Sequence, residues 1–573
     1  MNRATEVQNL LNGVQARVVE FIRDADNDSL RRNNSNGTAT QDAGVNHAAG
    51  VLEYLKPDEL QKKLQLEFPT AGQGQDGLLS LIDKVLRYSV NTWHQGFMDK
   101  LYASTNAPGV AAELVLAALN TNVHVYQVSP VLSVVEKLTA KRLASLFGLN
   151  GPTSGGISVQ GGSASNTTAI VIARNTLFPK TKTDGNGAHQ FVIFTSAHGH
   201  YSLEKAAQMI GLGSSSVWNV PVDEQGRMIP HSLETLIQEA KNSGKTPFFV
   251  NATAGTTVLG AFDPFPEIAV ICRKYSLWMH IDGSWGGSFI FSRRQSAKLN
   301  GSHLADSVAI NPHKMLGVPV TCSFLLAADL RKFHRANTLP AGYLFHSDEN
   351  ELIERAPCGS LTESEAGSPE VWDLADLTLQ CGRRGDALKL FLSWNYYGSE
   401  GYEQQIDGAV DIAAHLAQTI DRSPDLILLS ENAPPCLQVC FYYAPFKRLV
   451  YHADRLVDGQ KLGEAERAKK NSRITETVAK QLINSGFMVD FAPPCGSQSI
   501  GDGKFFRCVV NVWTKKETVD RLVNEVIRLA AKEVMRERGL VLNGNLLPQK
   551  PRSEPGQRPR NPLEKGHGPV VYH

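Results

Sequence analysis

Residues 307–314 read Ser-Val-Ala-Ile-Asn-Pro-His-Lys, a short apolar run that leads into a proline turn and a lysine. A run that is apolar at consecutive positions, not at alternate ones, is typical of a strand covered by helices on both faces. Such a strand would bring Lys314 to the carboxyl edge of a parallel sheet, where a lysine can lose solvent and act as an amine nucleophile toward a carbonyl. Taken alone, the run is also compatible with a surface lysine after a turn.

Three similar runs lie upstream and extend this prediction to a whole sheet. They read FVIFTS at 191–196, TPFFVNAT at 246–253 and LWMHID at 277–282, and helical stretches at 232–241 and 265–275 alternate with them. Strands that alternate with helices predict an α/β fold with a parallel sheet. Ligands bind beyond the carboxyl ends of the strands in such sheets, so we expect the polar residues that end the runs to converge. These residues are 196–200, Thr253, Asp282 and 311–314.

A glycine-rich segment supplies a candidate anion site. Residues 155–166 read GGISVQGGSASN, and an apolar helical stretch follows at 169–177. Glycines allow a close approach of the backbone, and a helix N-terminus offers free N–H groups to a phosphate. The segment has no GxGxxG pattern, and the GKT at 244–246 lacks the upstream glycine of a P-loop. We therefore expect a phosphate that belongs to neither ATP nor a dinucleotide.

Asp282 and His200 are suited to a flat ring. A carboxylate at a strand end can keep a pyridine nitrogen protonated, and an imidazole can stack on the ring. Taken alone, Asp282 is also compatible with a helix N-cap or a metal or ribose ligand. The His-Gly-His at 198–200 lacks a further ligand at metal-binding spacing, so we expect no metal. An amine nucleophile, a carboxylate, a phosphate cradle and an imidazole at one sheet edge are what pyridoxal 5′-phosphate needs.

With these elements the sequence resembles the group II pyridoxal-phosphate decarboxylases, in the branch of glutamate decarboxylase and cysteine sulfinate decarboxylase. The resemblance runs from about residue 52 to residue 531. It is close in the motifs NATAGTTVLGAFDP at 251–264, NPHKMLGVP at 311–319, LQCGRR at 379–384 and FFRCVV at 505–510. It implies the α/β fold type I of pyridoxal-phosphate enzymes, which is aspartate-aminotransferase-like. It also implies a homodimer with the active site at the subunit interface.

The resemblance assigns roles to individual residues. Lys314 would hold the cofactor covalently, His200 would stack on its ring, and Asp282 would pair with the pyridine nitrogen. The other implied cofactor contacts are Thr253, Ser163, Ala164, Ser165, Asn311, His313 and Ser284, the last in place of a small apolar residue of the family. Arg507 would hold the α-carboxylate of the substrate. The residues implied to contact an acidic side chain are Lys100, Leu101 and Tyr102, where the family has Gln-Leu-Ser, together with Asn122.

The implied reaction is the α-decarboxylation of glutamate, aspartate or cysteine sulfinate to CO₂ and the corresponding amine. Lys100 either pairs with the acidic side chain or points to solvent, and Tyr102 leaves less volume than a serine, which favours a shorter acid. Glutamate decarboxylase protonates its product with a loop tyrosine, but Trp372 stands at that position and an indole N–H is no useful acid. His200 is then the candidate proton donor. Oxidation or transamination on the same fold, and a non-catalytic relative, are the alternatives.

Composition and patterning define the remaining expectations. The 573 residues carry 58 Lys and Arg against 57 Asp and Glu, a balance that does not indicate nucleic acid or an anionic membrane as partner. No apolar run is long enough to span a membrane, no secretory signal is visible and the eight cysteines include no CxxC pair, so we expect a cytoplasmic protein. The expected organisation is an N-terminal helical segment (1–87) with a flexible linker (25–50), a large cofactor-binding domain (88–404), a small α+β domain (405–542) and a disordered tail (543–573). We expect a long loop at 346–378 to be a lid or disordered.

Overall fold

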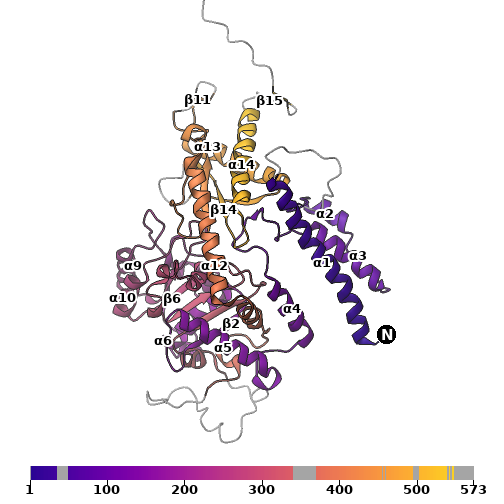
Figure 1. Ribbon diagram of the computed structural model, residues 1–573. Coiled ribbons are helices and arrows are strands. Elements are labelled where there is room, and N and C mark those ends of the chain that lie inside the picture. Colours follow the sequence, from indigo (N-terminus) through magenta and orange to yellow (C-terminus); the bar gives the residue numbers. More distant parts are fainter. Residues whose placement is uncertain are drawn as a thin grey trace, which may run out of the picture.

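The four apolar runs form neighbouring strands of a seven-stranded sheet (Figure 1). The computed structural model describes residues 2–34, 50–339, 370–454, 456–457, 460–494, 502–537, 541–542 and 545–546. The strand order is β2-β8-β7-β6-β5-β3-β4; β8 is antiparallel to both neighbours, and the other pairs are parallel. The strands are β2 (Gly155–Val159), β3 (Phe191–Ser196), β4 (Val217–Val220), β5 (Thr246–Thr253), β6 (Trp278–Gly283), β7 (Ser307–Ile310) and β8 (Ser323–Ala327). The predicted mainly parallel sheet is confirmed.

Helices cover this sheet, which explains why every residue of β3, β6 and β7 is buried. Helix α6 packs against β5 to β8, α10 against β5 and β6, α9 against β4 and β5, and α5 against β2 and β8. The helices of this part are α4 (Ala107–Leu119), α5 (Pro130–Leu146), α6 (Gly162–Leu177), α7 (Thr181–Asp184), α8 (Ser202–Met209), α9 (Pro230–Asn242), α10 (Phe265–Tyr275) and α11 (Arg331–Asn337). Both helices predicted between the apolar runs are confirmed.

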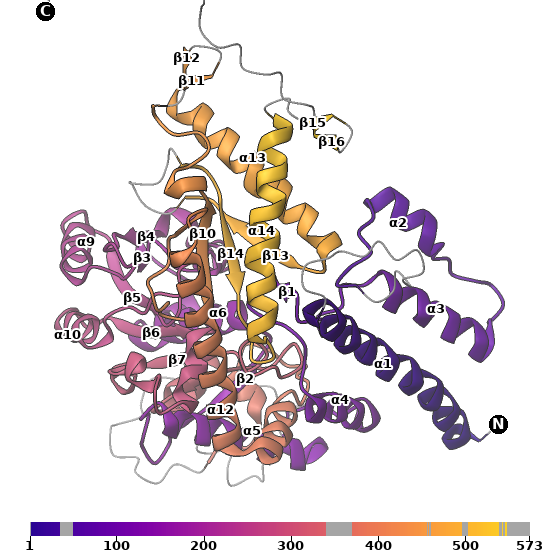
Figure 2. The same cartoon turned by 45° about the horizontal axis from the view of Figure 1, so that its top comes forward.

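A second sheet of five strands lies beside the first (Figure 2). Its order is β1 (Phe97–Met98), β13 (Met488–Ala492), β14 (Phe505–Val509), β10 (Gln438–Tyr443) and β9 (Leu426–Leu428). Helix α13 (Glu464–Leu482) packs against β13 and β14, and α14 (Lys516–Glu537) packs against α13 and β10. The other short strands are β11 (Leu456–Val457), β12 (Gln460–Lys461), β15 (Val541–Leu542) and β16 (Asn545–Leu546).

The two sheets share chain segments, and here the structure differs from the expected boundaries. Helix α12 (Ala387–Arg422) continues across the expected boundary at 404, with its one non-helical residue at Gly398. Strand β1 precedes the large sheet in the chain but pairs in parallel with β13 of the small sheet. Helix α12 and the pairing of β1 with β13 therefore join the two sheets, whereas the sequence pattern predicts them in separate domains.

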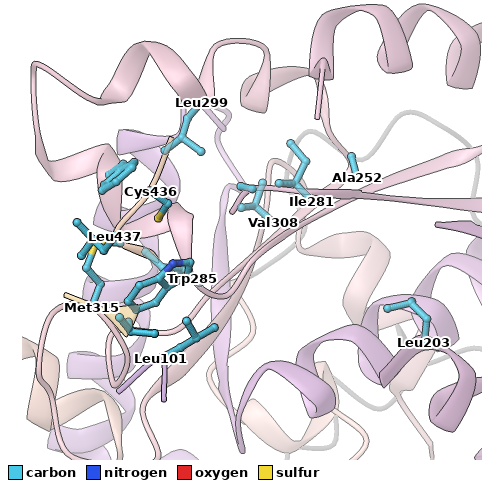
Figure 3. Packing of buried hydrophobic residues seen from close by; sticks show 14 of the residues in the cluster. Leu101, Leu203, Ala252, Ile281, Trp285, Leu299, Val308, Met315, Cys436 and Leu437 are labelled. Carbon is cyan, nitrogen blue, oxygen red and sulfur yellow. The ribbon is translucent and has the colours of Figure 1, made fainter. Parts of the chain in front are cut away.

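Figure 3 shows how apolar side chains join the two parts. Leu101, Met315 and Leu437 gather around Trp285, and Trp285 also donates a hydrogen bond from Nε1 to Gln438 Oε1 on β10 (2.9 Å). Trp285 follows the end of β6, so this contact ties the edge of the large sheet to the small one.

The N-terminal segment forms helices at one side of the molecule (Figure 1). These are α1 (Arg3–Asn34), α2 (Pro57–Leu64) and α3 (Gly74–Tyr88), and α1 packs against α3 and α14. The expected linker at 25–50 is wrong for residues 25–34, which continue α1. Residues 35–49, the loop residues 346–369 and most of the tail lie outside the described residues. None of the described helices is long and apolar enough to cross a lipid bilayer.

A buried ion cluster explains why α1 extends beyond its predicted end. Asp28 is 1% exposed and accepts hydrogen bonds from Arg31, from Arg32 (2.5 Å) and from His94 (2.9 Å), which lies just before β1. Burial by itself would raise the pKa of Asp28, but the hydrogen bonds from His94 and Arg32 outweigh it and lower the pKa to about 2. The segment that its Asn, Ser and Gly content predicted to be a linker is thus held in the helix by ion pairs within α1 and by the bond to His94.

We expect Asp28→Asn to lower the free energy of unfolding at neutral pH by on the order of 3 kcal/mol, because it removes a buried carboxylate that binds Arg31, Arg32 and the buried His94 ring. The pKa of Asp28 is depressed in the folded state, so its contribution is present above pH 4 and is lost as the pH falls toward about 2. Urea unfolding of both proteins at several pH values measures this. Asp26→Asn, on an exposed position of the same helix, is the control. An equal effect of the two substitutions would contradict the prediction.

Candidate active site

A cavity of about 260 Å³ lies at the carboxyl edge of the large sheet. The predicted residues that line it are Leu101, Ser163, His200, Thr253, Asp282, Ser284, Asn311, His313 and Lys314. Other lining residues are Gly162, His198, Tyr201, Gly255, Thr257 and Trp285. The polar ends of the strands therefore meet, as parallel strands with aligned carboxyl ends require.

Lys314 enters the cavity from the turn after β7. Its backbone N–H donates to Asn311 O (3.0 Å), which closes the proline turn, and its side-chain amine has no hydrogen-bond partner among the described residues. Burial lowers the pKa of Lys314, while the charge of Asp282 opposes that shift. A lysine with a lowered pKa and an unbonded amine is suited to nucleophilic attack on a carbonyl.

Asp282 ends β6 on the floor of the same cavity. Its Oδ1 accepts from the backbone N–H of Ser284 (3.0 Å), and its Oδ2 accepts from Asn166 Nδ2 (2.9 Å). Burial by itself would raise the pKa of Asp282, but these hydrogen bonds and the charge of Lys314 together lower it. The buried carboxylate is therefore ionised at neutral pH.

Three imidazoles among the residues that the structure describes line the cavity, and two of them, His198 and His200, lie in the turn after β3. His200 Nδ1 accepts from the backbone N–H of Ser202 (3.2 Å), so a neutral His200 carries its proton on Nε2. His198 has a buried Nδ1 without a partner in the described part of the chain. Burial lowers the pKa of both residues, and the charge of Lys314 lowers that of His200 further, which favours neutral rings at pH 7.

The glycine-rich segment provides the start of α6. Gly161 has a φ of 93°, and the first helical hydrogen bond runs from Ser165 N to Gly161 O (3.0 Å). The N–H groups of Ser163 and Ala164 precede that bond and are free of helical partners. A Cβ atom at Gly162 would lie 2.4 Å from Ser284 Oγ and 3.0 Å from the Asn311 amide, so this position must be glycine. Ala164 and Ser165 do not line the cavity with their side chains; Ser165 is fully buried in the helix.

Arg507 lies behind the cavity wall. Its guanidinium donates to Thr257 O (3.1 Å), to Asp99 O (3.0 Å) and to Asp490 Oδ2 (2.6 Å), and its buried Nε has no partner. Thr257 is the cavity residue among these contacts. Arg507 therefore contacts a residue that lines the cavity but does not line the cavity itself.

Three predicted substrate contacts lie outside the cavity of their own chain. Lys100 pairs with Asp490 Oδ2 (2.9 Å) and Asp99 Oδ2 (3.2 Å), so it neither points freely to solvent nor lines the cavity. Tyr102 packs on Phe97, with ring centroids 5.7 Å apart. Asn122 Oδ1 accepts from the backbone N–H of Arg383 (2.8 Å), in the LQCGRR motif.

Trp372 also lies away from the cavity of its own chain. Its ring makes an edge contact with Tyr126, with centroids 5.5 Å apart, and Lys137 Nζ lies 4.4 Å from its centroid. The tryptophan is therefore held against α5 and is not placed to donate a proton within this chain's cavity.

Sequence reasoning missed two buried residues that support the site. Asp263 accepts from the backbone N–H groups of Thr253 (2.7 Å) and Met228 (2.7 Å), and it thereby holds the end of β5. Asn166 binds Asp282 from α6. Asp263 is a polar residue among apolar neighbours in AFDPFP at 261–266, which is the signal that could have identified it, whereas Asn166 lies in the polar run SASNTT at 163–168 and gives no such signal.

Comparisons with known proteins agree with this geometry. Residues 57–444 match the pyridoxal-dependent decarboxylase conserved domain. The chain is 50% identical over 523 residues to an L-aspartate decarboxylase of Metarhizium robertsii, covering 91% of this chain and 96% of the relative. It is 36% identical over 488 residues to an acidic amino acid decarboxylase of Xenopus tropicalis, covering 84% and 88%. The crystal structure of mouse CSAD superposes with a TM-score of 0.77 at 31% identity, covering 92% of this chain and 99% of that chain.

We expect Gly162→Ala to weaken the binding of pyridoxal phosphate by at least about tenfold, because the added methyl group would displace Ser284 or Asn311 from the cradle. Equilibrium titration of the apoprotein, followed by absorbance, measures this. Gly72→Ala is the matched control, since a Cβ there meets nothing within 4 Å. Unchanged affinity in the Gly162 variant would show that the segment does not hold the phosphate.

Proposed function

The chain belongs to the pyridoxal-dependent decarboxylase family, in its glutamate decarboxylase and cysteine sulfinate decarboxylase branch, and we propose that it converts L-aspartate to CO₂ and β-alanine. It is a carboxy-lyase that uses pyridoxal phosphate. The observation that carries the proposal is the meeting of Lys314, Asp282 and His200 beside a glycine cradle in one cavity. The relative from Metarhizium robertsii supports aspartate over glutamate and cysteine sulfinate.

The residues of the cavity fit pyridoxal phosphate. The buried hydroxyls of Thr253 and Ser284 have no partner within the described residues, and the N–H groups at the start of α6 are open to an anion. Lys314 supplies the amine that such an aldehyde requires, and Asp282 supplies an ionised carboxylate for a ring nitrogen. When bound, pyridoxal phosphate accepts the electron pair that the departing carboxylate leaves behind.

We propose a separate role for each of three residues of the cavity. Lys314 would hold the cofactor covalently. Asp282 would offer its negative charge to the ring nitrogen, and His200 would stack on the ring and exclude water from it. We propose His200 as the group that protonates the product carbon, after it has taken up a proton from solvent, because the neutral ring that its lowered pKa favours is too weak an acid by itself.

Arg507 is proposed to hold the α-carboxylate, and its surroundings suggest how Lys100 takes part. Both cations bind the same oxygen, Asp490 Oδ2, at 2.6 Å from Arg507 Nη2 and 2.9 Å from Lys100 Nζ. Asp490 competes with a substrate carboxylate for Arg507. Lys100 offsets that competition because it neutralises Asp490, and it therefore acts through Arg507 and does not touch the substrate.

The homodimer is a further part of the proposal. Helix α4 packs one face on α12, where Glu113 pairs with Lys389 (3.0 Å), and leaves apolar side chains exposed on its other face. The exposed apolar residues of α4 and α5 are Val110, Leu114, Val115, Leu119, Val131, Val134 and Leu138. An exposed apolar surface of this kind is typical of a subunit interface.

With purified protein and pyridoxal phosphate, we expect L-aspartate to yield equal amounts of CO₂ and β-alanine, faster than glutamate or cysteine sulfinate yields its amine. Lys314→Ala should lose turnover and the visible absorbance of the bound cofactor, because no other amine of the described residues lines the cavity. Simultaneous assay of CO₂ and amine measures this. CO₂ in excess of amine would indicate oxidation or transamination, and turnover by the lysine variant would refute the assigned roles.

We expect Lys100→Gln to raise the KM of every acidic substrate by about the same factor, severalfold, because Asp490 then holds Arg507 more tightly. Lys100→Arg keeps the charge and should retain most of the affinity. Steady-state kinetics with the three acidic amino acids measures this. A change of about tenfold in the ratios between substrates would instead show that Lys100 contacts the distal carboxylate.

Leu114→Glu combined with Leu138→Glu should produce monomers without activity, because two carboxylates would be buried at the proposed interface. Sedimentation velocity measures the oligomeric state. Val270→Glu on α10, an apolar residue that is 63% exposed, is the control and should leave the dimer intact. Dimers in the double variant would place the interface elsewhere.

A further inference from the structure

We propose that a chain of hydrogen-bond donors behind the cavity holds Asp282 as an ionised, oriented carboxylate, and that its members are Trp278, Ser307, His280 and Asn166 in that order. We call these four residues the donor relay. None of them is among the residues assigned above to the cofactor or the substrate. The inference rests on the proposed contact between Asp282 and the ring nitrogen, and it adds positioning residues to that contact.

The donor relay is continuous and buried. Trp278 Nε1 lies 2.9 Å from Ser307 Oγ, which lies 2.8 Å from His280 Nδ1. His280 Nε2 lies 3.1 Å from Asn166 Oδ1, and Asn166 Nδ2 lies 2.9 Å from Asp282 Oδ2. Ser307, His280 and Asn166 are fully buried, and Trp278 is 2% exposed. Water therefore does not compete for these bonds.

The far end of the relay is compatible with one direction of its protons. An indole N–H can only donate, so Ser307 Oγ accepts from Trp278, and its own hydrogen can be given to His280 Nδ1. A neutral imidazole that accepts at Nδ1 carries its proton on Nε2, where it donates to Asn166. Burial lowers the pKa of His280 to about 4, which agrees with a neutral ring.

The near end sets the same direction independently. An ionised carboxylate only accepts, so Asn166 must turn its NH₂ group toward Asp282 and its carbonyl oxygen toward His280. That oxygen needs a donor, and His280 Nε2–H supplies it. The carboxylate and the neutral ring of His280 therefore direct the protons of the relay toward Asp282, and the indole donor at the far end is compatible with this direction.

This arrangement disfavours protonation of Asp282. Its two protein partners, the Ser284 N–H and the Asn166 NH₂, are both donors, so a protonated carboxyl group would find no acceptor between them. Asn166 also donates to Ser202 Oγ (2.9 Å), and the backbone N–H of Ser202 donates to His200. One buried amide therefore links the carboxylate on the cavity floor to the turn that carries the proposed stacking imidazole.

The test compares the apoprotein's affinity for pyridoxal phosphate and for its deaza analogue, which keeps the aldehyde and phosphate but has a C–H in place of the ring nitrogen. Asn166→Leu should weaken pyridoxal phosphate binding by about tenfold and analogue binding by less than about threefold, because only the former uses the charge on Asp282. A purely structural role would weaken both equally. Equilibrium titration by fluorescence quenching provides the readout without turnover.

Asn166→Asp is the isosteric partner variant. At about pH 8.5 the introduced carboxylate opposes Asp282, so the affinity for pyridoxal phosphate should fall. Toward about pH 6 the introduced carboxyl group takes up a proton and can donate it in a hydrogen bond to Asp282, so part of the affinity should return. The leucine variant should show no such recovery, and recovery in both variants, or in neither, would contradict the proposal.

Three further variants keep the test decisive. Ser307→Ala breaks the relay at its far end and should reduce the preference for pyridoxal phosphate over the analogue, whereas Ser307→Thr keeps the hydroxyl and should retain it. This pair decides the matter if circular dichroism shows that Asn166→Leu does not fold. Asp282→Asn tests the premise and should abolish the preference. If Asp282→Asn loses the preference for pyridoxal phosphate but the Asn166 and Ser307 variants weaken both ligands equally, the relay is overturned and the ring contact stands. If Asp282→Asn keeps the preference, the proposed contact with the ring nitrogen is itself overturned.

Discussion

The opposed charges of Asp282 and Lys314, both withdrawn from water at one edge of a sheet, set the requirements for the rest of the site. Burial favours the neutral form of each group, and the charge of each favours the ionised form of the other. The pair is useful only if neighbouring groups do not neutralise either member. The imidazoles around it accordingly have lowered pKa values, and that of His313 is about 4, again because of burial. The neutral rings leave the charge of Asp282 uncancelled, so the carboxylate keeps its electrostatic influence on the cavity.

A carboxylate can be kept in such a place only if its hydrogen bonds are complete. Asp282 has a donor on each oxygen, and the donor to Oδ2 is itself held by neighbours that run back into the core. The same principle acts at Asp263, which accepts two backbone N–H groups and holds the end of β5. Its pKa is nevertheless raised to about 6 by burial, because it has no cationic partner. The contrast between the two aspartates shows that backbone donors orient a buried carboxylate, whereas a nearby cation helps to keep it ionised.

Much of the fold could be predicted because the signals are local. Helix α10 begins and ends at the predicted residues, and the four apolar runs are strands whose ends line the cavity. Residues 25–34 could not be predicted, because their charges pair with His94 and with each other only after folding. Strand β1 could not be predicted either, because its two residues pair with β13, a strand that lies far away in the sequence, and this pairing exists only in the folded chain. The same holds for Lys100, whose partner Asp490 lies 390 residues away in the chain.

The sequence by itself therefore determined the order of strands and helices, the lysine and carboxylate that face each other, and the glycine segment that opens toward a phosphate. Periodicity, turn residues and motif spacing carry that information because they act over a few neighbouring residues. Only the tertiary structure decided which of the remaining polar residues serve the site. It placed Arg507 and Lys100 on one oxygen of Asp490, and it aligned Trp278, Ser307, His280 and Asn166 toward Asp282. Hydrogen bonds depend on distance and direction between atoms from separate elements, and these quantities exist only once the sheets have packed.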